Sequence, residues 1–557
     1  MRTTPTWFGP PERPLFGCFH IPEDGRARGV VVMCGPLGRE VANAQPAIQA
    51  LSDQLAGCGV AALRFAYAGT GDSAGDFDGP GRLADWLASI DQAVAFARRS
   101  TDGPVVLLGM RTGGLLAIEA VTRGTAVDHL VVWDPWATGR EVLRFERTLL
   151  ATGYGAKQEG DGSVTGPGFV YSAETVEELS ALTLASADYS TVEHALVAVR
   201  SEGRGMAAAQ DGAAHVDWIE VDGQPDLLDV PPQMITLPAT TIKTIVDWVS
   251  RVLDGPEGAM RVDVVTDAEV ARDATGRAIT EHAEWLGPNE LFGIVTEPGA
   301  DPDPSSPTVV FLSAGALDHT GAGRKWVELA RRFAGEGLRC VRVDLDGIGE
   351  TFGRPDLPRQ VPKPPEAIDD LTDLAGALGD PDGRNLVLVG LSSGGYHAIE
   401  AGLRLHPRGV CAINPGMTGW VPDVDLGVID RRRLAYRPMP AFLRDLSVKH
   451  SRVALRLWQL RCQVLVKGSP IHPVATVSRR GVPVLVIVSE ADAHEFEPSL
   501  YWSVVRRRLR RRGTLVIEVI PGDDHSLYTV EGQARGYPLL TRWILDRFAP
   551  VLPADAR

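Results

Sequence analysis

The chain of 557 residues is 44% hydrophobic and 23% charged, and it carries a formal net charge of −15. This composition excludes a mostly disordered chain, and the length predicts two to four domains. No run of about 18 apolar residues occurs, so we expect no membrane span. Residues 1–14 lack the apolar segment of a signal peptide, and the six cysteines form no CxxC pair, so a reducing cytoplasm is the expected compartment.

Short apolar runs alternate with helical stretches along both halves of the chain. Such runs, bounded by turn residues, are typical of strands buried on both faces of a parallel sheet. The alternation therefore predicts an α/β layered fold. In chain order the expected strands include residues 30–33, 105–108, 309–312, 386–389, 484–488 and 515–520, and the last expected helix spans about residues 537–548.

Four groups of residues in the first half recur in the same order in the second. The matched groups are 7–10 and 285–288 (W-F-G-P, W-L-G-P), 57–60 and 335–338 (G-C-G-V, G-E-G-L), 69–73 and 347–351 (G-T-G-D-S, G-I-G-E-T), and 109–114 and 390–395 (G-M-R-T-G-G, G-L-S-S-G-G). An ordered series of matches predicts a duplication. We therefore expect two homologous domains, about residues 1–256 and 257–557, joined where turn residues cluster.

Residues 390–394 read G-L-S-S-G and directly follow an expected strand. In a strand–turn–helix context, the G-x-S-x-G pattern predicts a nucleophile elbow with Ser392 on a sharp turn. Small residues two positions to either side allow the strand and the helix to approach each other. The alternative interpretation is a chance glycine-rich turn.

A serine hydroxyl attacks efficiently only when a base removes its proton, and the base is commonly a histidine oriented by a carboxylate. Behind this elbow the partners follow in the order Ser, acid, His. Asp492, after the penultimate expected strand, is the predicted acid, and Glu490 is the fallback. His525, on the loop after the last expected strand, is the predicted base. Other histidines are expected to be structural, and His397 should pack against the sheet.

The tetrahedral intermediate of acyl transfer needs backbone donors for its negatively charged oxygen. The amide of Ser393, the residue after the nucleophile, is expected to supply one donor. The second should come from the loop after the expected strand 309–312, where Gly315 and Ala316 are both candidates. This chemistry requires no metal ion and no organic cofactor.

These motifs resemble the α/β-hydrolase superfamily. In the second half the resemblance rests on residues 313–315 (S-A-G), 326–330 (W-V-E-L-A), 342–349 (R-V-D-L-D-G-I-G), 390–394 and 524–526 (D-H-S). More narrowly, this half is similar to serine aminopeptidase-like hydrolases and to the hydrolases that accompany exosortase systems. The first half resembles a sister group through residues 63–73 and 168–172. The resemblance implies two tandem α/β-hydrolase domains, each a mostly parallel sheet flanked by helices with a cap insert, and it implies serine chemistry.

Alignment of the halves gives the first half no equivalent of the proposed trio. The aligned pairs are Arg111 with Ser392, Arg204 with Asp492, and Asp226 with His525. Arginine retains its proton and can act neither as an activated nucleophile nor as a base, so the first half is expected to be catalytically silent. Three roles remain open for it: a structural partner, a domain in which Arg111 binds a carboxylate or phosphate, and an internal ion pair of Arg111 with Asp226.

Two inserts are expected to act as caps over the substrate pockets, at about residues 137–192 and 418–481. The second insert is rich in arginine and lysine, and residues 506–512 add a basic run on an expected helix. This charge could be solvated, could dock on the acidic first half, or could recruit an anionic acyl donor such as coenzyme A or an acyl or peptidyl carrier protein. The acidic overall balance and the lack of a recognition motif argue against nucleic acid as a partner.

The sequence thus predicts a serine hydrolase or acyltransferase that forms an acyl-enzyme on Ser392, with His525 as the base and Asp492 as its orienting acid. Small-molecule esters or thioesters are the expected substrates. Hydrolysis and transfer to an alcohol or amine use the same trio, so the acceptor stays open. The alternatives are a peptidase and a non-catalytic scaffold that binds a carrier protein.

Overall fold

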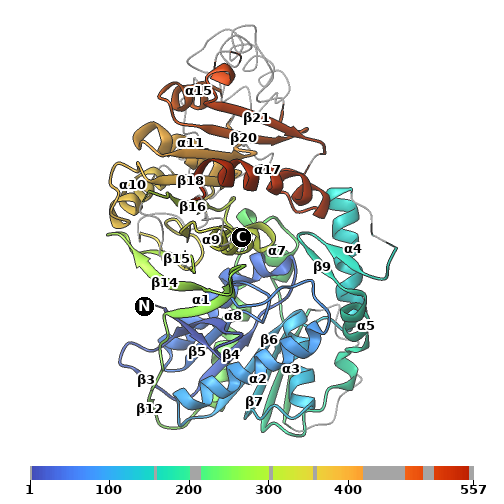
Figure 1. Cartoon of the computed structure of the whole chain (residues 1–557). Helices are drawn as coiled ribbons and strands as arrows, with labels where there is room; N and C mark the ends of the chain where they lie inside the picture. Colours follow the sequence, from blue (N-terminus) through green and yellow to red (C-terminus); the bar gives the residue numbers. More distant parts are fainter. Residues whose placement is uncertain are drawn as a thin grey trace, which may run out of the picture. The chain divides into compact units, whose positions relative to one another are not determined.

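The computed structural model describes residues 3–155, 158, 160–200, 215–299, 305–354, 361–364, 366–417, 471–493, 507, 509–522 and 524–550. Most of the expected cap at residues 418–481 lies outside the described residues, as do Arg204 and part of the basic run at 506–512. The chain folds into two compact units, Met1–Arg272 with Gly276–Ala283 and Asp273–Thr275 with Glu284–Arg557. Both are built on mixed sheets flanked by helices, which confirms the predicted α/β class (Figure 1). None of the described helices has the length and apolarity needed to span a bilayer.

The first unit contains an eight-stranded sheet with the strand order β1-β2-β5-β4-β6-β7-β10-β11. The strands from β5 to β11 in this order are parallel, and β2 joins β5 in the antiparallel sense. The strands are β1 (Thr4–Phe8), β2 (Leu15–His20), β4 (Val30–Cys34), β5 (Ala61–Phe65), β6 (Val105–Met110), β7 (His129–Trp133), β10 (His194–Val199) and β11 (Val216–Glu220). The strands expected at residues 30–33 and 105–108 are therefore confirmed.

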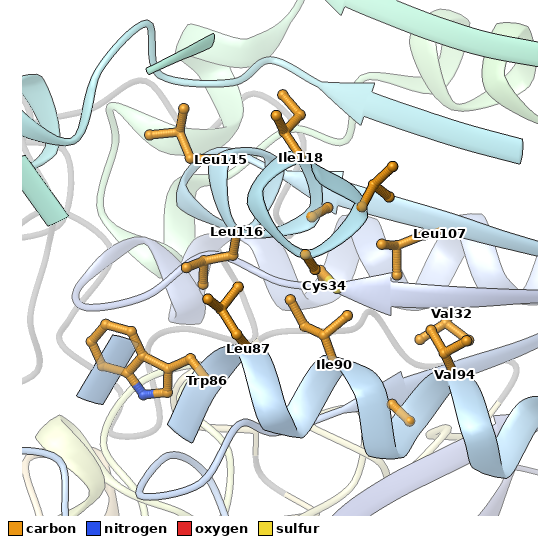
Figure 2. Close-up of a cluster of buried hydrophobic side chains, with 14 of the residues drawn as sticks. Val32, Cys34, Trp86, Leu87, Ile90, Val94, Leu107, Leu115, Leu116 and Ile118 are labelled. Atoms are coloured by element: carbon orange, nitrogen blue, oxygen red, sulfur yellow. The ribbon is translucent and has the colours of Figure 1, made fainter. Parts of the chain in front are cut away.

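Alternate residues of these strands are buried on opposite faces of the sheet. On one face Val32 and Leu107 pack with side chains of α2 and α3 (Figure 2). On the other face Val31 and Leu108 pack with side chains of α1 and α8. Burial on both faces explains why the strands are continuous apolar runs rather than alternating ones. The four helices are α1 (Glu40–Gly57), α2 (Arg82–Ser100), α3 (Thr112–Thr122) and α8 (Ala239–Val252).

The sheet of the second unit has the strand order β15-β17-β16-β18-β19-β20-β21, and the end of β14 extends it beyond β15. Strands β17 to β21 in this order are parallel, whereas β15 pairs with β17 in the antiparallel sense. The strands are β14 (Ala278–Leu286), β15 (Leu291–Glu297), β16 (Thr308–Leu312), β17 (Cys340–Val343), β18 (Leu386–Leu391), β19 (Gly409–Ile413), β20 (Val484–Ser489) and β21 (Leu515–Ile520). All four strands expected in this half are present.

Helices cover both faces of this sheet as well. Side chains of α10, α11 and α15 form one core with the strands. On the other face Phe311 of β16 contacts Trp326 and Phe333 of α9, and Trp326 also contacts Tyr537 of α17. The helices are α9 (Lys325–Gly335), α10 (Ala367–Ala377), α11 (Ser393–Arg404), α15 (Ile471–Arg479) and α17 (Val530–Phe548).

The start of the last helix was predicted too late in the sequence. Gly532 and Gly536, before the predicted start near residue 537, and Pro538, just after it, lower the intrinsic helix propensity of this stretch. The helix nevertheless begins at Val530, because the Thr529 side chain accepts a hydrogen bond from the amide of Gly532 and caps it. Gly536 lets the helix pack closely, since a Cβ there would lie 3.0 Å from a Leu527 methyl carbon.

The two units repeat local hydrogen bonds as well as strands. In the first unit the amide of Phe16 donates to the hydroxyl of Ser73 at 2.9 Å. In the second unit the amide of Phe292 donates to the hydroxyl of Thr351, also at 2.9 Å. Both hydroxyls belong to the third repeated group of the sequence. The shared contact supports the duplication that the ordered motifs predicted.

Candidate active site

Ser392 lies on a sharp turn between β18 and α11. Its backbone has φ 53° and ψ −116°, a strained conformation that costs about 1–3 kcal/mol for a residue other than glycine. A Cβ on Gly390 would lie 2.2 Å from the carbonyl oxygen of Gly394, and a Cβ on Gly394 would lie 2.3 Å from that of Leu312. The two glycines of the motif are therefore required by backbone contacts on both sides of the turn.

Three side chains from distant parts of the sequence form one hydrogen-bonded chain at this turn. The Nε2 atom of His525 lies 2.9 Å from the hydroxyl oxygen of Ser392, and its Nδ1 atom lies 2.7 Å from Oδ2 of Asp492. The imidazole is 42% exposed and the carboxylate 25% exposed, so solvent reaches the site. Glu490, the fallback acid, has an exposed side chain, and its amide donates to the carbonyl oxygen of Gly522 at 3.0 Å.

The order of atoms in this chain determines what it can do. A carboxylate can accept a hydrogen bond but cannot donate one, so the Nδ1 atom of His525 carries the hydrogen that faces Asp492. The Nε2 atom of the neutral ring is then an acceptor for the Ser392 hydroxyl. The arrangement can take a proton from the serine oxygen and stabilise the imidazolium that results.

The loop after β16 lies against the start of α11. The amide of Gly315 donates to the hydroxyl of Ser393 at 2.7 Å, and the amide of Leu317 donates to the carbonyl oxygen of Ala314 at 3.0 Å. Between them, the amide of Ala316 has no acceptor within the described part of the chain. The amide of Ser393 is the first of α11, and helix-start amides lack an intrahelical acceptor. Of the two loop candidates, Ala316 thus has the available amide, because that of Gly315 is already bonded.

The far end of the same loop is held by a buried carboxylate. Asp344 accepts hydrogen bonds from the backbone amide of His319 at 2.6 Å and from the amide of Glu350 at 2.9 Å. Its other contact is to the ring Nδ1 atom of His319, at 2.9 Å. Burial raises the pKa of Asp344 to about 6. His319 therefore acts as a structural histidine that anchors the loop.

Residues 309–534 match the family model described as "Alpha/beta hydrolase family". The second unit belongs to the α/β-hydrolase superfamily. The narrower similarity to aminopeptidase-like and exosortase-associated hydrolases stays a prediction.

Solved structures of other proteins match about half of the chain. The chain is similar to Est1E from Butyrivibrio proteoclasticus with bound ferulic acid, at 16% identity over 45% of this chain and 99% of that one, with a TM-score of 0.36. It is also similar to the esterase domain of a Rhodothermus marinus protein, at 16% identity over 45% of this chain and 99% of that one, with a TM-score of 0.33. No curated protein matches the chain significantly.

Two side chains that the sequence analysis did not single out contact the trio of the α/β-hydrolase unit. The hydroxyl of Ser489, at the end of β20, donates to Oδ2 of Asp492 at 2.8 Å. Asn414, just after β19, bonds to the backbone at Ser489 and at His525. A signal for Asn414 was present in the repeat, because Asn-Pro follows β19 where Asp-Pro follows the corresponding strand of the first unit.

The first unit has the same kind of sharp turn between β6 and α3, with Arg111 at the position that Ser392 occupies in the second unit. Arg111 donates through Nε to Glu40 at 2.8 Å, and its Nη1 atom lies 3.2 Å from a carboxylate oxygen of Asp134. The guanidinium is buried and lies 3.9 Å from the ring centroid of Trp136. Arg111 is thus held in an internal ion pair. The suggested partner was wrong, because Asp226 is exposed on the short helix α7 (Gln224–Leu228), while Glu40 and Asp134 occupy the buried positions.

Strand register corrects the alignment of the two halves by one residue. The amide of Asp134 donates to the carbonyl oxygen of Ala198, and in the same way the amide of Asn414 donates to that of Ile487. Two residues further along, Arg200 of the first unit therefore corresponds to Ser489, whereas the sequence alignment used Ser201. Arg204, aligned with the acid, lies outside the described residues.

The insert expected to cap the first unit contains α4 (Gly139–Tyr154) and α5 (Ala173–Ala181), with the hairpin of β8 (Val164–Gly166) and β9 (Phe169–Tyr171) between them. Helix α4 places Glu146 against Gly38, where an added Cβ would lie 2.0 Å from Oε1 of the carboxyl. Gly38 follows β4 as Ala316 follows β16. A carboxyl group of α4 therefore lies directly against the loop after β4 in the first unit.

Proposed function

We propose that the second unit is a serine hydrolase or acyltransferase that acts on esters or thioesters through an acyl-enzyme on Ser392. The observation that supports this most directly is the position of His525, whose two ring nitrogens lie 2.9 Å from the serine hydroxyl and 2.7 Å from the Asp492 carboxylate. A histidine in contact with both groups can accept the serine proton and later return it.

In the first half-reaction, the Ser392 oxygen attacks the acyl carbon while Nε2 of His525 takes its proton. The carbonyl oxygen becomes negatively charged, and the amides of Ser393 and Ala316 are proposed to donate to it. When the tetrahedral intermediate collapses, the bond to the leaving alcohol or thiol breaks, and the imidazolium gives that group its proton. The acyl group remains as an ester on the serine oxygen.

The second half-reaction repeats these steps with a new nucleophile. Water, an alcohol or an amine loses a proton to His525 and attacks the acyl ester, and Ser392 regains its proton as it leaves. The trio serves hydrolysis and transfer equally. The acceptor therefore depends on what the pocket admits. Coenzyme A or a carrier protein as the acyl donor stays a prediction, because most of the basic insert lies outside the described residues.

We propose a structural role for the first unit rather than substrate binding. The Arg111 guanidinium already forms ion pairs with Glu40 and Asp134. The pair of N–H donors that would bind a ligand carboxylate is therefore engaged within the unit. Glu146 also fills the space beside the loop after β4.

Covalent labelling tests the catalytic proposal. The full chain is incubated with a fluorophosphonate, and its intact mass is measured alongside that of Ser392→Ala. We expect one adduct on the wild type, none on the variant, and slow labelling of His525→Ala. A second experiment measures the mass added by short, medium and aromatic acyl thioesters and esters. Labelling that persists in Ser392→Ala would mean that another residue is the nucleophile, whereas a wild type that never labels would favour the non-catalytic scaffold.

A further inference from the structure

Asn414 connects the two segments that carry the acid and the base. Its Nδ2 group donates to the main-chain carbonyl oxygen of His525 at 2.7 Å, and its Oδ1 atom accepts from the amide of Ser489 at 2.7 Å. The side chain is completely buried. One amide group therefore fastens the histidine loop to the end of β20, three residues before Asp492.

The two contacts require an amide at this position. A carbonyl oxygen can only accept and a backbone N–H can only donate, so the side chain must offer one donor and one acceptor on the same carbon. Aspartate has the same shape but no donor when ionised, and its second oxygen would face the carbonyl oxygen of His525. Alanine leaves both buried backbone groups without this partner.

The backbone aims the Asn414 side chain at these partners. Its φ is 43°, a left-handed conformation that asparagine tolerates better than most residues. The amide of Asn414 also donates to the carbonyl oxygen of Ile487 at 2.8 Å, which fixes the turn to β20. Both the main chain and the side chain of Asn414 therefore form hydrogen bonds to β20.

The first unit supplies a natural comparison at the same site. Asp134 has φ 47°, and its carboxylate accepts two contacts of 2.9 Å from Nε of Arg200, the residue that corresponds to Ser489. The contact between these two positions is retained in both units. It is charged where the elbow carries Arg111 and neutral where the elbow carries Ser392. An aspartate beside the trio would place another negative charge near Asp492, and the amide avoids this.

We propose that Asn414 is a positioning residue for the Ser392 reaction, which holds His525 at the distance where its ring contacts both the serine and the acid. This inference rests on the proposed function. The tether acts on the main chain of His525, and a displacement of the ring of about 1 Å is enough to reduce the rate about a hundredfold.

The test compares Asn414→Asp and Asn414→Ala with the wild type in the full-length protein. The readouts are the rate constant for fluorophosphonate labelling, kcat and KM on an ester found to acylate the protein, and the melting temperature. Asn385→Ala is the matched control, because this asparagine also donates to a main-chain carbonyl oxygen, that of Ser306 at 3.1 Å, but precedes β18 at its opposite end. The control should label and turn over at the wild-type rate.

We expect both Asn414 variants to label about tenfold to a hundredfold more slowly and to lose kcat with little change in KM. A double-mutant cycle with Asp492→Asn separates positioning from a general loss of structure. If Asn414 acts through His525, the double variant will be little slower than the slower single variant. If its role is only structural, the two losses will multiply and the melting temperature will account for the decline.

The outcomes distinguish this inference from the proposed function. A wild-type protein that neither labels nor turns over any ester would overturn the proposed function. A wild type that labels, together with an Asn414→Asp variant that labels equally fast, would overturn the positioning role alone. If Asn414→Ala does not fold, Asn414→Asp still decides the question, because it keeps the shape and the acceptor while it removes the donor and adds one negative charge.

Discussion

Arg111 and Ser392 share one backbone conformation, with φ 54° and ψ −119° for the first and φ 53° and ψ −116° for the second. The strain of this turn persists in the first unit although its side chain cannot attack a carbonyl. The reason lies in the surrounding packing, since a Cβ on Gly109 would lie 2.4 Å from the carbonyl oxygen of Gly113, as at the elbow of the second unit. The turn therefore serves to connect the strand to the helix in both units. The residue at the turn determines whether the site has a nucleophile.

Replacement of Arg111 by alanine is expected to destabilise the first unit without slowing the reaction at Ser392. The change leaves the buried carboxylates of Glu40 and Asp134 without this partner, and a broken buried ion pair costs about 3–5 kcal/mol. Urea unfolding of the full chain measures the loss, and labelling below the transition measures the reaction. Arg123→Ala removes only an exposed pair with Glu119, so it should stay within about 0.5 kcal/mol. A raised KM at unchanged stability would instead point to substrate contact.

Glu146 should make the stability of the first unit fall as the pH rises. Burial, followed by the charge of Glu40, raises the pKa of Glu146 from 4.5 to about 8. Between these values the folded chain keeps a proton that the unfolded chain has lost, so the free energy of unfolding decreases by about 1.4 kcal/mol per pH unit, and the decrease ends above the folded pKa.

The Glu146→Gln variant isolates this contribution. Glutamine keeps an acceptor for the backbone amide of Arg39 but does not titrate. The free energy of unfolding of this variant should therefore not fall between pH 6 and 8 through this side chain, and it should exceed that of the wild type at pH 8. Urea unfolding at pH 6, 7 and 8 gives both slopes, and their difference removes the contribution of other groups. Parallel slopes in the two proteins would show that this carboxyl does not retain its proton.

The strands and the three residues Ser392, Asp492 and His525 could be predicted from the sequence because they follow local patterns. Apolar runs bounded by turns mark strands buried on both faces, and the glycine spacing around Ser392 marks a turn that only small neighbours permit. Asp492 and His525 were selected because each follows a strand, and parallel strands bring such loops to one edge of the sheet. The structure brings these three residues together.

Other features depend on contacts between segments that have no local signal. Glu40 and Asp134 pair with Arg111 only after three separate loops meet at one edge of the sheet. The alignment slipped by one residue because S-E-G at residues 201–203 resembles S-E-A at residues 489–491. Only strand register distinguishes Arg200 from Ser201 as the equivalent of Ser489. The role of Asn414 likewise depends on two backbone groups that are far from it in the sequence.

Gly394→Ala should slow the reaction at Ser392. The new methyl group would lie 2.3 Å from the carbonyl oxygen of Leu312 and 2.7 Å from that of Ser313, so the loop after β16 must move away from the elbow. We expect labelling of Ser392 to slow about a hundredfold. Gly376→Ala is the control, because a Cβ in that part of α10 meets no atom within 4 Å and should stabilise the helix by about 0.5–1 kcal/mol. Normal labelling of Gly394→Ala would show that the loop tolerates the shift.

Ser393 offers a test of the loop that is separate from the amide it also provides. In Ser393→Ala the main-chain amide remains, but the hydroxyl that accepts from Gly315 at 2.7 Å is lost. Without this hydrogen bond the loop positions the amide of Ala316 less firmly. We expect kcat to fall about tenfold with little change in KM, because this donor is proposed to stabilise the transition state. Ser478→Ala, which removes another buried hydroxyl bonded to the carbonyl oxygen of Thr514, should leave kcat unchanged. Equal kinetics for the two variants would mean that the loop keeps its position without the Ser393 hydroxyl.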